Sequence, residues 1–275
     1  MTEARKRQRM AEAFDDLSGS YDDPHHDRIA RALVAFVAPT AAESVADAAC
    51  GTGAAALATA AALASAGPGP GGGPGGPVLA VDLSPGMVAA GRARAARLGL
   101  AGAVDWRVAP AVPLPVPDGS LDLVLCASSL HFLGAAALAD WLRALRPGGR
   151  VGFTLPLVGG FHPRGVFAEL LAADLALPAD ADQARTLALD AGFTDPAARV
   201  VTAADARAVV LVRARTPGQP AEEPDPVPTR RSVAGGTAAE GEPHATFSAG
   251  ADGRPPGPVP WTGVERARDA RRPGR

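Results

Sequence analysis

Aromatic residues, cysteines and net charge are all scarce in this sequence, and long apolar runs are absent. The 275 residues are 4% aromatic, include two cysteines and carry a net charge of −2. Two cysteines, Cys50 and Cys126, make no disulfide framework, so we expect reduced thiols and a cytoplasmic protein. Nucleic-acid binding would need a basic field, and a membrane span would need about eighteen uncharged apolar residues in a row. We therefore expect neither, and the sequence leaves the oligomeric state open.

Composition divides the chain into regions. Residues 1–215 alternate helix-like and strand-like patterns, and the apolar content of 47% suffices for a sizeable core. Residues 67–77, G-P-G-P-G-G-G-P-G-G-P, form a glycine- and proline-rich insert. Residues 216–275 contain no leucine or isoleucine and cannot bury enough apolar surface to offset their ordering entropy. We predict one domain over 1–215 and a disordered tail over 216–275.

Within residues 1–215, short strand patterns alternate with alanine-rich helical patterns. The predicted strands are 44–49, 77–82, 103–108, 121–127, 150–155, 197–202 and 207–213. The predicted helices are 28–38, 54–66, 85–98, 135–145, 164–176 and 181–191. This spacing predicts an α/β fold with a mostly parallel seven-stranded sheet, helices on both faces and a C-terminal antiparallel hairpin.

The first motif is V-A-D-A-A-C-G-T-G, residues 45–53, where a strand ends in a glycine turn. A helix follows from Ala54, and free N–H groups at its start favour a carboxylate or a phosphate. Asp47 either orients the glycine loop or pairs with a cationic ligand group. The same residues also fit the dinucleotide pattern G-x-G-x-x-A, or a bare turn without a ligand.

The second motif is V-L-A-V-D-L-S-P-G-M, residues 78–87. A strand ends in Asp82, and Ser84 and Pro85 begin a helix as N-cap and first residue. An acidic residue at the end of a second strand usually binds ribose hydroxyls, so we favour this role over that of a helix-start aspartate.

Two further stretches follow. In P-D-G-S-L-D-L-V-L-C-A-S-S-L-H-F-L, residues 117–133, a buried strand is followed by Ser128, Ser129 and His131. In W-L-R-A-L-R-P-G-G-R-V, residues 141–151, a helix stops, a glycine turn follows and a strand begins.

Together and in this order, the four motifs resemble the class I S-adenosylmethionine-dependent methyltransferases. The nearest branch has the type-11 methyltransferase domain and is similar to the ubiquinone/menaquinone C-methyltransferases. A-F-D-D-L-S-G-S-Y-D and L-A-L-D-A-G-F-T-D also match, so the resemblance covers about residues 12–215. It implies a Rossmann-like fold, S-adenosyl-L-methionine as cofactor and a small-molecule methyl acceptor.

The resemblance also implies cofactor-binding roles for ten residues. The loop around the methionine part of the cofactor would contain Asp47, Ala49, Gly51 and Gly53. Asp82 would hold the ribose, Leu83 and Met87 would flank the adenine, Ala127 and Ser128 would line the sulfonium end, and Tyr21 would close the site.

Two positions depart from the family pattern. Ala49 replaces the first glycine of the loop. Pro110 stands where an acidic residue usually accepts a hydrogen bond from the adenine amino group, and a proline can neither accept that bond with its side chain nor donate one from its backbone. Losing one such contact costs roughly 0.5–1.5 kcal/mol of binding free energy.

Candidates for proton transfer are few. His131 is the first candidate for a general base because it follows the fourth strand, where the methyl group is expected. His25, His26 and His162 are weaker candidates, and no cluster of cysteine and histidine has the spacing of metal ligands.

We expect an active methyltransferase. One alternative is a degenerate methyltransferase fold that acts as a non-catalytic binding protein. The other is an NAD(P)-binding oxidoreductase, which is disfavoured because Asp47 lies inside the first strand and the chain has no Tyr-x-x-x-Lys pair.

Overall fold

The computed structural model describes residues 3–21, 24–66, 76–202 and 208–218. These residues belong to one compact unit within residues 1–223, and residues 219–275 lie outside the description. Most of the predicted insert at 67–77 and all but three residues of the predicted tail at 216–275 also lie outside the described residues. The division of the chain at residue 215 therefore stays a prediction.

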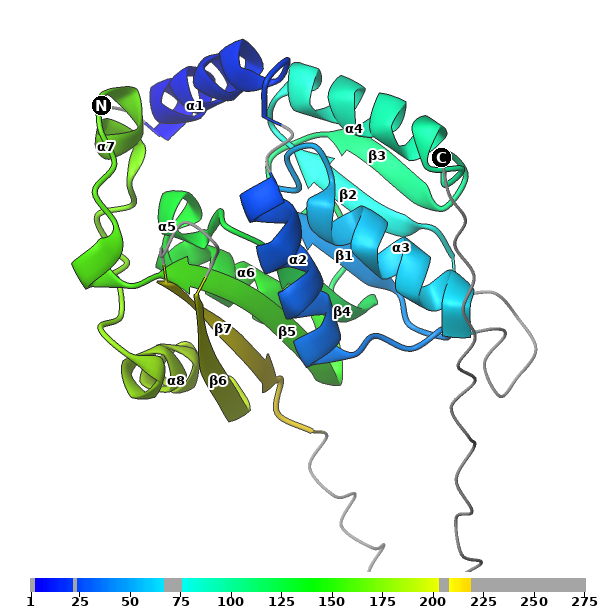
Figure 1. Ribbon diagram of the computed structural model, residues 1–275. Helices are drawn as coiled ribbons and strands as arrows, with labels where there is room; N and C mark the ends of the chain where they lie inside the picture. The colour runs from blue at the N-terminus through cyan, green and yellow to red at the C-terminus, as the bar shows by residue number, and fades with distance from the viewer. Residues whose placement is uncertain (1–2, 22–23, 67–75, 203–207, 219–275) are drawn as a thin grey trace, which may run out of the picture. The chain divides into compact units, whose positions relative to one another are not determined.

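A seven-stranded sheet organises the described residues (Figure 1). Its strands are β1 (Val45–Ala48), β2 (Val78–Asp82), β3 (Val104–Val108), β4 (Leu121–Cys126), β5 (Leu145–Pro156), β6 (Thr194–Thr202) and β7 (Ala208–Arg215). The strand order is β3-β2-β1-β4-β5-β7-β6. All neighbouring pairs are parallel except β5–β7 and β6–β7, which are antiparallel. The predicted fold class is confirmed.

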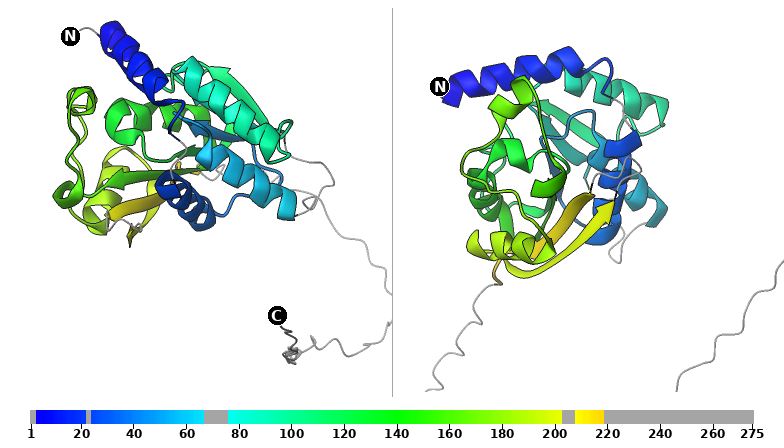
Figure 2. Two further views of the ribbon diagram at one scale, coloured as in Figure 1. Left: turned by 45° about the horizontal axis from the view of Figure 1, so that its top comes forward. Right: turned by 60° about the vertical axis from the view of Figure 1, so that its left-hand side comes forward.

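Helices cover both faces of this sheet (Figure 2). α2 (Pro24–Val37), α3 (Ala54–Ala66) and α4 (Pro85–Arg97) bury their apolar sides on one face. α5 (Leu130–Leu133), α6 (Ala135–Ala144) and α8 (Ala181–Asp190) do so on the other. Successive strand residues contribute to opposite cores, as Val45 and Ala46 do in β1. Because both faces are buried, β1, β2 and most of β4 consist of buried residues.

The helix pattern differs from the prediction mainly at two places. α1 (Glu3–Leu17) was not predicted, although Met10, Phe14 and Leu17 have helical spacing. The helix predicted over 164–176 was wrong, because only α7 (Val166–Leu170) is helical. The chain after α7 is held in another path: the N–H of Ala172 donates to the carbonyl of His131 at 2.9 Å, and Asp174 accepts a bond from the N–H of Ala135.

Smaller differences concern element ends. α2 begins at Pro24 and not at residue 28, because proline starts a helix without losing a hydrogen bond. β5 begins at Leu145, directly after α6. Leu145 pairs with Leu121 and Arg150 with Leu123, so the intervening Pro-Gly-Gly segment bulges out of the ladder and does not precede the strand.

Trp106 in β3 explains the need for glycine at two positions. A Cβ added to Gly53, which has φ +81°, would lie 2.2 Å from the Trp106 ring, and one added to Gly91 in α4 would lie 2.3 Å from it. The indole therefore fits between the start of α3 and the middle of α4 only because both positions lack a side chain. Gly53 serves packing between helix and sheet.

Replacing Gly53 with alanine tests this packing. We expect Gly53→Ala to lower the free energy of unfolding by roughly 2–4 kcal/mol, because the new methyl group overlaps the indole and φ is positive. Gly102→Ala is the control, because a Cβ there meets nothing within 4 Å and no positive φ is involved. Chemical denaturation measures both, and equal stabilities of the two variants would contradict the packing role.

Candidate functional site

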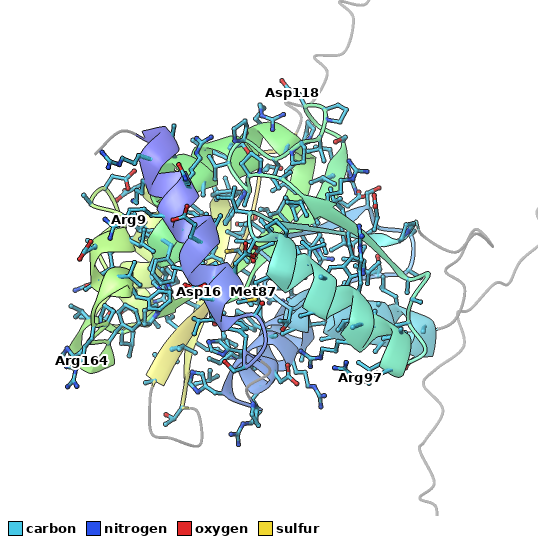
Figure 3. The ribbon with its side chains drawn as sticks, turned by 90° about the horizontal axis from the view of Figure 1, so that it is seen from above. Arg9, Asp16, Met87, Arg97, Asp118 and Arg164 are labelled. Carbon is cyan, nitrogen blue, oxygen red and sulfur yellow. The ribbon has the colours of Figure 1, made fainter. Side chains whose placement is uncertain are left out.

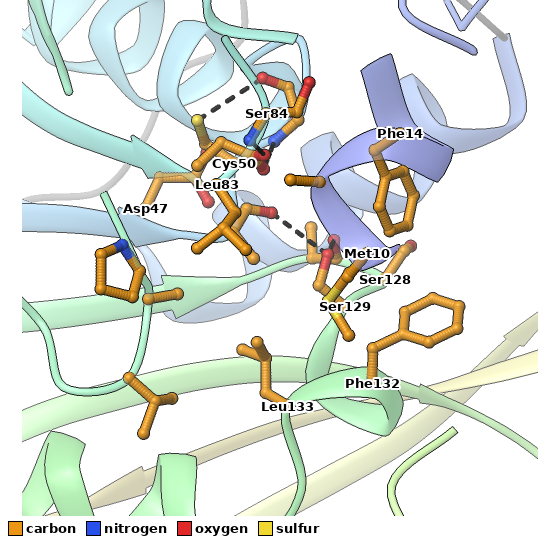
Figure 4. Close-up of a pocket in the computed structure, with 18 of the residues that line it drawn as sticks. Met10, Phe14, Asp47, Cys50, Leu83, Ser84, Ser128, Ser129, Phe132 and Leu133 are labelled. Carbon is orange, nitrogen blue, oxygen red and sulfur yellow. Dashed lines mark hydrogen bonds between the residues drawn. The ribbon is translucent and has the colours of Figure 1, made fainter. Parts of the chain in front are cut away.

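A cavity of about 470 Å³ lies at the carboxyl ends of β1, β2 and β4, beneath α1 (Figure 4). This is where parallel α/β sheets bind ligands, and the volume is typical of a ligand site. Asp47, Cys50, Leu83 and Ser84 lie toward one end. Phe14 and Phe132 lie toward the other. The end with the buried carboxyl groups of Asp47 and Asp82 is called the polar end, and the end with the rings of Phe14 and Phe132 is called the apolar end.

Asp82 organises the polar end. One carboxylate oxygen accepts the N–H of Gly51 at 2.8 Å and the other accepts the N–H of Ser84 at 2.9 Å. Burial raises the pKa of Asp82, although the bonds from Ser84 and Gly51 oppose that rise. Each oxygen keeps a further lone pair, so the carboxylate can still accept bonds from ligand hydroxyls.

Asp47 is buried in β1 and is only 1% exposed. Its Oδ2 accepts the N–H of Ala56 at 2.8 Å in the first turn of α3. Its Oδ1 is buried with no hydrogen-bond partner among the described residues. Burial raises the pKa of Asp47 to about 7. At neutral pH the Oδ1 atom of this carboxylate therefore lacks a donor, and a cationic ligand group would supply one.

The raised pKa of Asp47 links stability to pH. Between about pH 4 and pH 7 the folded protein binds more protons at Asp47 than the unfolded chain, so the stability contributed by this group falls as pH rises. Asp47→Asn keeps the shape and removes the titration. We expect the variant to gain stability relative to the parent as pH rises through this window, by an amount on the order of a few kcal/mol.

Denaturant titrations from pH 4.5 to 8 measure this effect. Asp105→Asn in β3 is the control, because the Asp105 side chain is 41% exposed and makes the same charge change outside the cavity. Parent and Asp47→Asn curves that run parallel across the whole range would contradict the assignment.

Two non-glycine residues adopt left-handed backbone conformations beside the cavity. Ala49 follows β1 with φ 55° and Ser128 follows β4 with φ 63°. The Ser128 N–H donates to the Thr154 hydroxyl oxygen at 2.8 Å, and the Ser129 hydroxyl donates to the Ala49 carbonyl at 3.1 Å. These bonds hold both strained residues in place, and strain of this kind is typical of functional sites.

Tyr21 lies beside the glycine loop. A Cβ on Gly51, whose φ is +55°, would lie 3.5 Å from the Tyr21 ring. Tyr21 also stacks on His26 with ring centroids 5.0 Å apart, and both side chains line the cavity. A Cβ at this distance would make an ordinary contact, so glycine is favoured at position 51 by its positive φ and not by lack of space.

α1 forms a roof over the cavity and is attached to the rest of the structure at two places (Figure 3). Near its C-terminal end, Asp15 accepts bonds from the Ser84 hydroxyl and, at 2.8 Å, from the Gly86 N–H. In the middle of the helix, Arg9 pairs with Glu169 of α7 at 2.8 Å. The sequence predicted that Tyr21 closes the site but did not predict this helix, for which the spacing of Met10 and Phe14 was the available signal.

Most of the predicted site residues line this one cavity, and three do not. The eight that line it are Tyr21, Asp47, Ala49, Gly51, Asp82, Leu83, Ala127 and Ser128. Gly53 faces Trp106, and Met87 is fully buried, so the structure does not place Met87 at an adenine site. Pro110 does line the cavity, where the family pattern has an acidic residue.

The structure does not support His131 as the general base. It is only 6% exposed and is absent from the cavity lining. Its ring packs against Phe132 and Phe161, with centroids 4.2 and 4.9 Å away. Burial, and secondarily the charge of His26, lowers the pKa of His131 to about 4, which makes it a weak base.

Further findings concern the two cysteines, possible metal ligands and possible membrane-spanning helices. Cys50 and Cys126 are free and buried, and burial raises the pKa of both thiols. Across the described ranges, no group of three histidine, cysteine or acidic side chains is placed to hold a metal ion. No helix in this part of the chain is long and apolar enough to cross a membrane.

Comparison with known proteins identifies the family. A model described as a methyltransferase domain matches residues 45–149. Aklanonic acid methyltransferase DauC from Streptomyces sp. (strain C5) is 32% identical over 162 residues, which are 57% of this chain and 69% of that protein. The chain belongs to the class I S-adenosylmethionine-dependent methyltransferases. Its cofactor is S-adenosylmethionine.

The match to two other relatives covers a smaller share of their length. Nocamycin O-methyltransferase from Saccharothrix syringae is 34% identical over 149 residues, 52% of this chain and 50% of that protein. The ubiquinone/menaquinone C-methyltransferase UbiE from Geobacter sulfurreducens is 30% identical over 146 residues, 44% of this chain and 57% of that protein. The chain thus spans little more than half the length of these two relatives.

A solved structure shares the fold. A methyltransferase from Aquifex aeolicus superposes with a TM-score of 0.53 at 18% identity, covering 73% of this chain and 97% of the other. At this identity the likeness concerns the fold alone.

Proposed function

We propose that this methyltransferase transfers the methyl group of S-adenosylmethionine to a small organic molecule held in the cavity beneath α1. The observation that carries the proposal is the single cavity that joins a buried carboxylate pair, Asp47 and Asp82, to an apolar end roofed by α1. A cofactor with two hydroxyls and an ammonium group fits the first end. The second end leaves room for an acceptor.

The residues at the polar end fit the cofactor. Asp82, with a spare lone pair on each oxygen, would accept the ribose hydroxyls. Asp47 presents a buried oxygen without a donor, which suits the methionyl ammonium group. Gly51 and Ser128 would lie along the methionyl part, and Leu83 would lie against the adenine.

The cofactor supplies a methyl group on a positively charged sulfur atom, so the protein's own task is alignment and exclusion of water. α1 closes the cavity from above, and its attachments at Asp15 and Arg9 hold that roof in place. Ala127 and Ser128, which directly follow β4, line the cavity and would face the sulfonium end of the cofactor.

Relatives transfer methyl groups to different atoms. The names of two of them specify O-methylation and C-methylation. Among the four histidine candidates, His26 lines the cavity and His131, His25 and His162 do not. An acceptor that needs a base would therefore meet His26, whereas an enolate carbon or an already acidic oxygen would need none.

Titration with S-adenosylhomocysteine tests the cofactor site. We expect the parent protein to bind it at micromolar levels. Asp82→Asn should weaken binding about tenfold or more, because a charge-assisted acceptor is replaced by an amide. Calorimetry on the full chain measures both, and unfolding curves show whether the variant remains folded.

Asp105→Asn is the matched control for this titration, since Asp105 lies in the neighbouring strand and outside the cavity lining. Equal affinity of Asp82→Asn and the parent for S-adenosylhomocysteine would contradict the proposed role of Asp82 in binding the ribose. Binding of NADH in place of S-adenosylhomocysteine would favour the oxidoreductase alternative.

Among the described residues, Pro110 is the observation that supports the non-catalytic alternative, since it lines the cavity without offering the usual acceptor. If adenine lies beside it, Pro110→Asp should raise the affinity for S-adenosylhomocysteine about two- to tenfold, the value of one added hydrogen bond. Pro110→Ala is the control, because it restores the backbone N–H without adding a carboxylate. Equal affinities of the two variants would place the adenine elsewhere.

A further inference from the structure

The apolar end of the cavity holds a concentration of aromatic side chains. The Phe14 ring lies 5.7 Å from Phe132 and 5.5 Å from Phe167, and Phe161 packs on His131 behind them. Four of the eight phenylalanines of the chain are thus gathered here, and of these Phe14 and Phe132 line the cavity. In a sequence with 4% aromatic residues, this gathering marks a surface suited to a flat apolar ring.

α1 places a cation beyond this aromatic surface. Phe14, Met10 and Lys6 follow one another at intervals of four residues, so they lie on one face of the helix, and all three line the cavity. Lys6 is the only lysine of the chain, and Arg7 beside it also lines the cavity. Going along α1 from Phe14, the cavity wall changes from aromatic to aliphatic to cationic.

The cationic end is the one remote from the cofactor. Asp15 fixes the C-terminal part of α1 to Ser84 and Gly86, next to the proposed ribose site. Lys6 lies nine residues before Asp15, at the opposite end, where its ammonium group donates to the Leu171 carbonyl at 3.4 Å. The rise of an α-helix places Lys6 about 12 Å along the axis from Phe14.

One carboxylate also lies at this end. Asp174 lines the cavity and accepts the Ala135 N–H at 3.2 Å at the start of α6, and it keeps its negative charge. Glu169 pairs with Arg9 and is not among the lining residues. Lys6 and Arg7 together outweigh Asp174, so an acceptor entering under α1 would meet a net positive charge.

We propose that the methyl acceptor is a ring-bearing organic anion: its ring packs on Phe14 and Phe132, and an acidic group at its far end pairs with Lys6 and Arg7. This assignment rests on the proposed function, because it places the acceptor in the cavity that also holds the cofactor. It makes Lys6 and Arg7 determinants of specificity for charge, and Phe14 and Phe132 determinants of specificity for shape.

Two probes that differ in charge alone test the assignment. 2-Naphthoate and 2-naphthamide share a ring system, and only the first is an anion at pH 7.5. Each is titrated calorimetrically into the full chain saturated with S-adenosylhomocysteine. We expect naphthoate to bind at least about threefold more tightly than naphthamide, the preference that a partly exposed ion pair provides.

Variants then show which residues cause the preference for naphthoate over naphthamide. The double variant Lys6→Gln/Arg7→Gln should lose it by weakening naphthoate alone. Arg5→Gln removes a charge from an exposed position of the same helix outside the cavity lining and should keep the preference. Phe14→Leu should weaken both probes alike.

The outcomes separate the two proposals. Equal affinity for the two probes, or a preference that survives in the double variant, would overturn the acidic acceptor. Failure of both probes to bind a protein that binds S-adenosylhomocysteine would overturn the ring-bearing acceptor and leave the cofactor site intact. Failure to bind S-adenosylhomocysteine would overturn the proposed function itself, and this inference with it.

Discussion

The carboxylate of Asp82 joins the segments on which the site depends. It accepts the Gly51 N–H from the loop after β1 and the Ser84 N–H at the start of α4. The Ser84 hydroxyl in turn donates to Asp15 of α1. The glycine loop, the second strand and the roof are therefore coupled through one buried group. Removing the Asp82 carboxylate would therefore disturb the glycine loop, the second strand and the roof.

This arrangement has an energetic cost. Asp47 and Asp82 are both buried near the same cavity, and burial raises the pKa of each because a carboxylate loses hydration there. A protein selected for stability alone would not place two carboxylates in this position. A bound group with hydroxyls and a positive charge compensates both, so the pair is best understood as part of a binding site.

Most of the strands and turns that surround the site were predictable from the sequence. β1, β2 and β4 are short apolar runs that end in turn signals, and Ser84 followed by Pro85 marks the start of α4 unambiguously. Because parallel strands present their carboxyl ends on one edge, Asp47, Asp82 and Ser128 could be expected together. The structure confirms that all three line one cavity.

The sequence alone could not show the tertiary contacts. A G-x-G pattern does not reveal which way each glycine faces, so Gly53 was assigned to the ligand, whereas it makes room for Trp106. α1 carries many charges and few apolar residues, and its helical face makes sense only against the cavity it covers. The position of His131 depended on the packing of α5 against Phe161, which lies thirty residues away in the chain.

The most direct measurement is a crystal structure of the full chain grown with S-adenosylhomocysteine. We expect its ribose hydroxyls on the Asp82 carboxylate and its ammonium group toward the free oxygen of Asp47, with the sulfur facing the apolar end beneath α1. A nucleoside bound elsewhere, or a cavity that stays empty in crystals containing the ligand at saturating concentration, would contradict the proposed site.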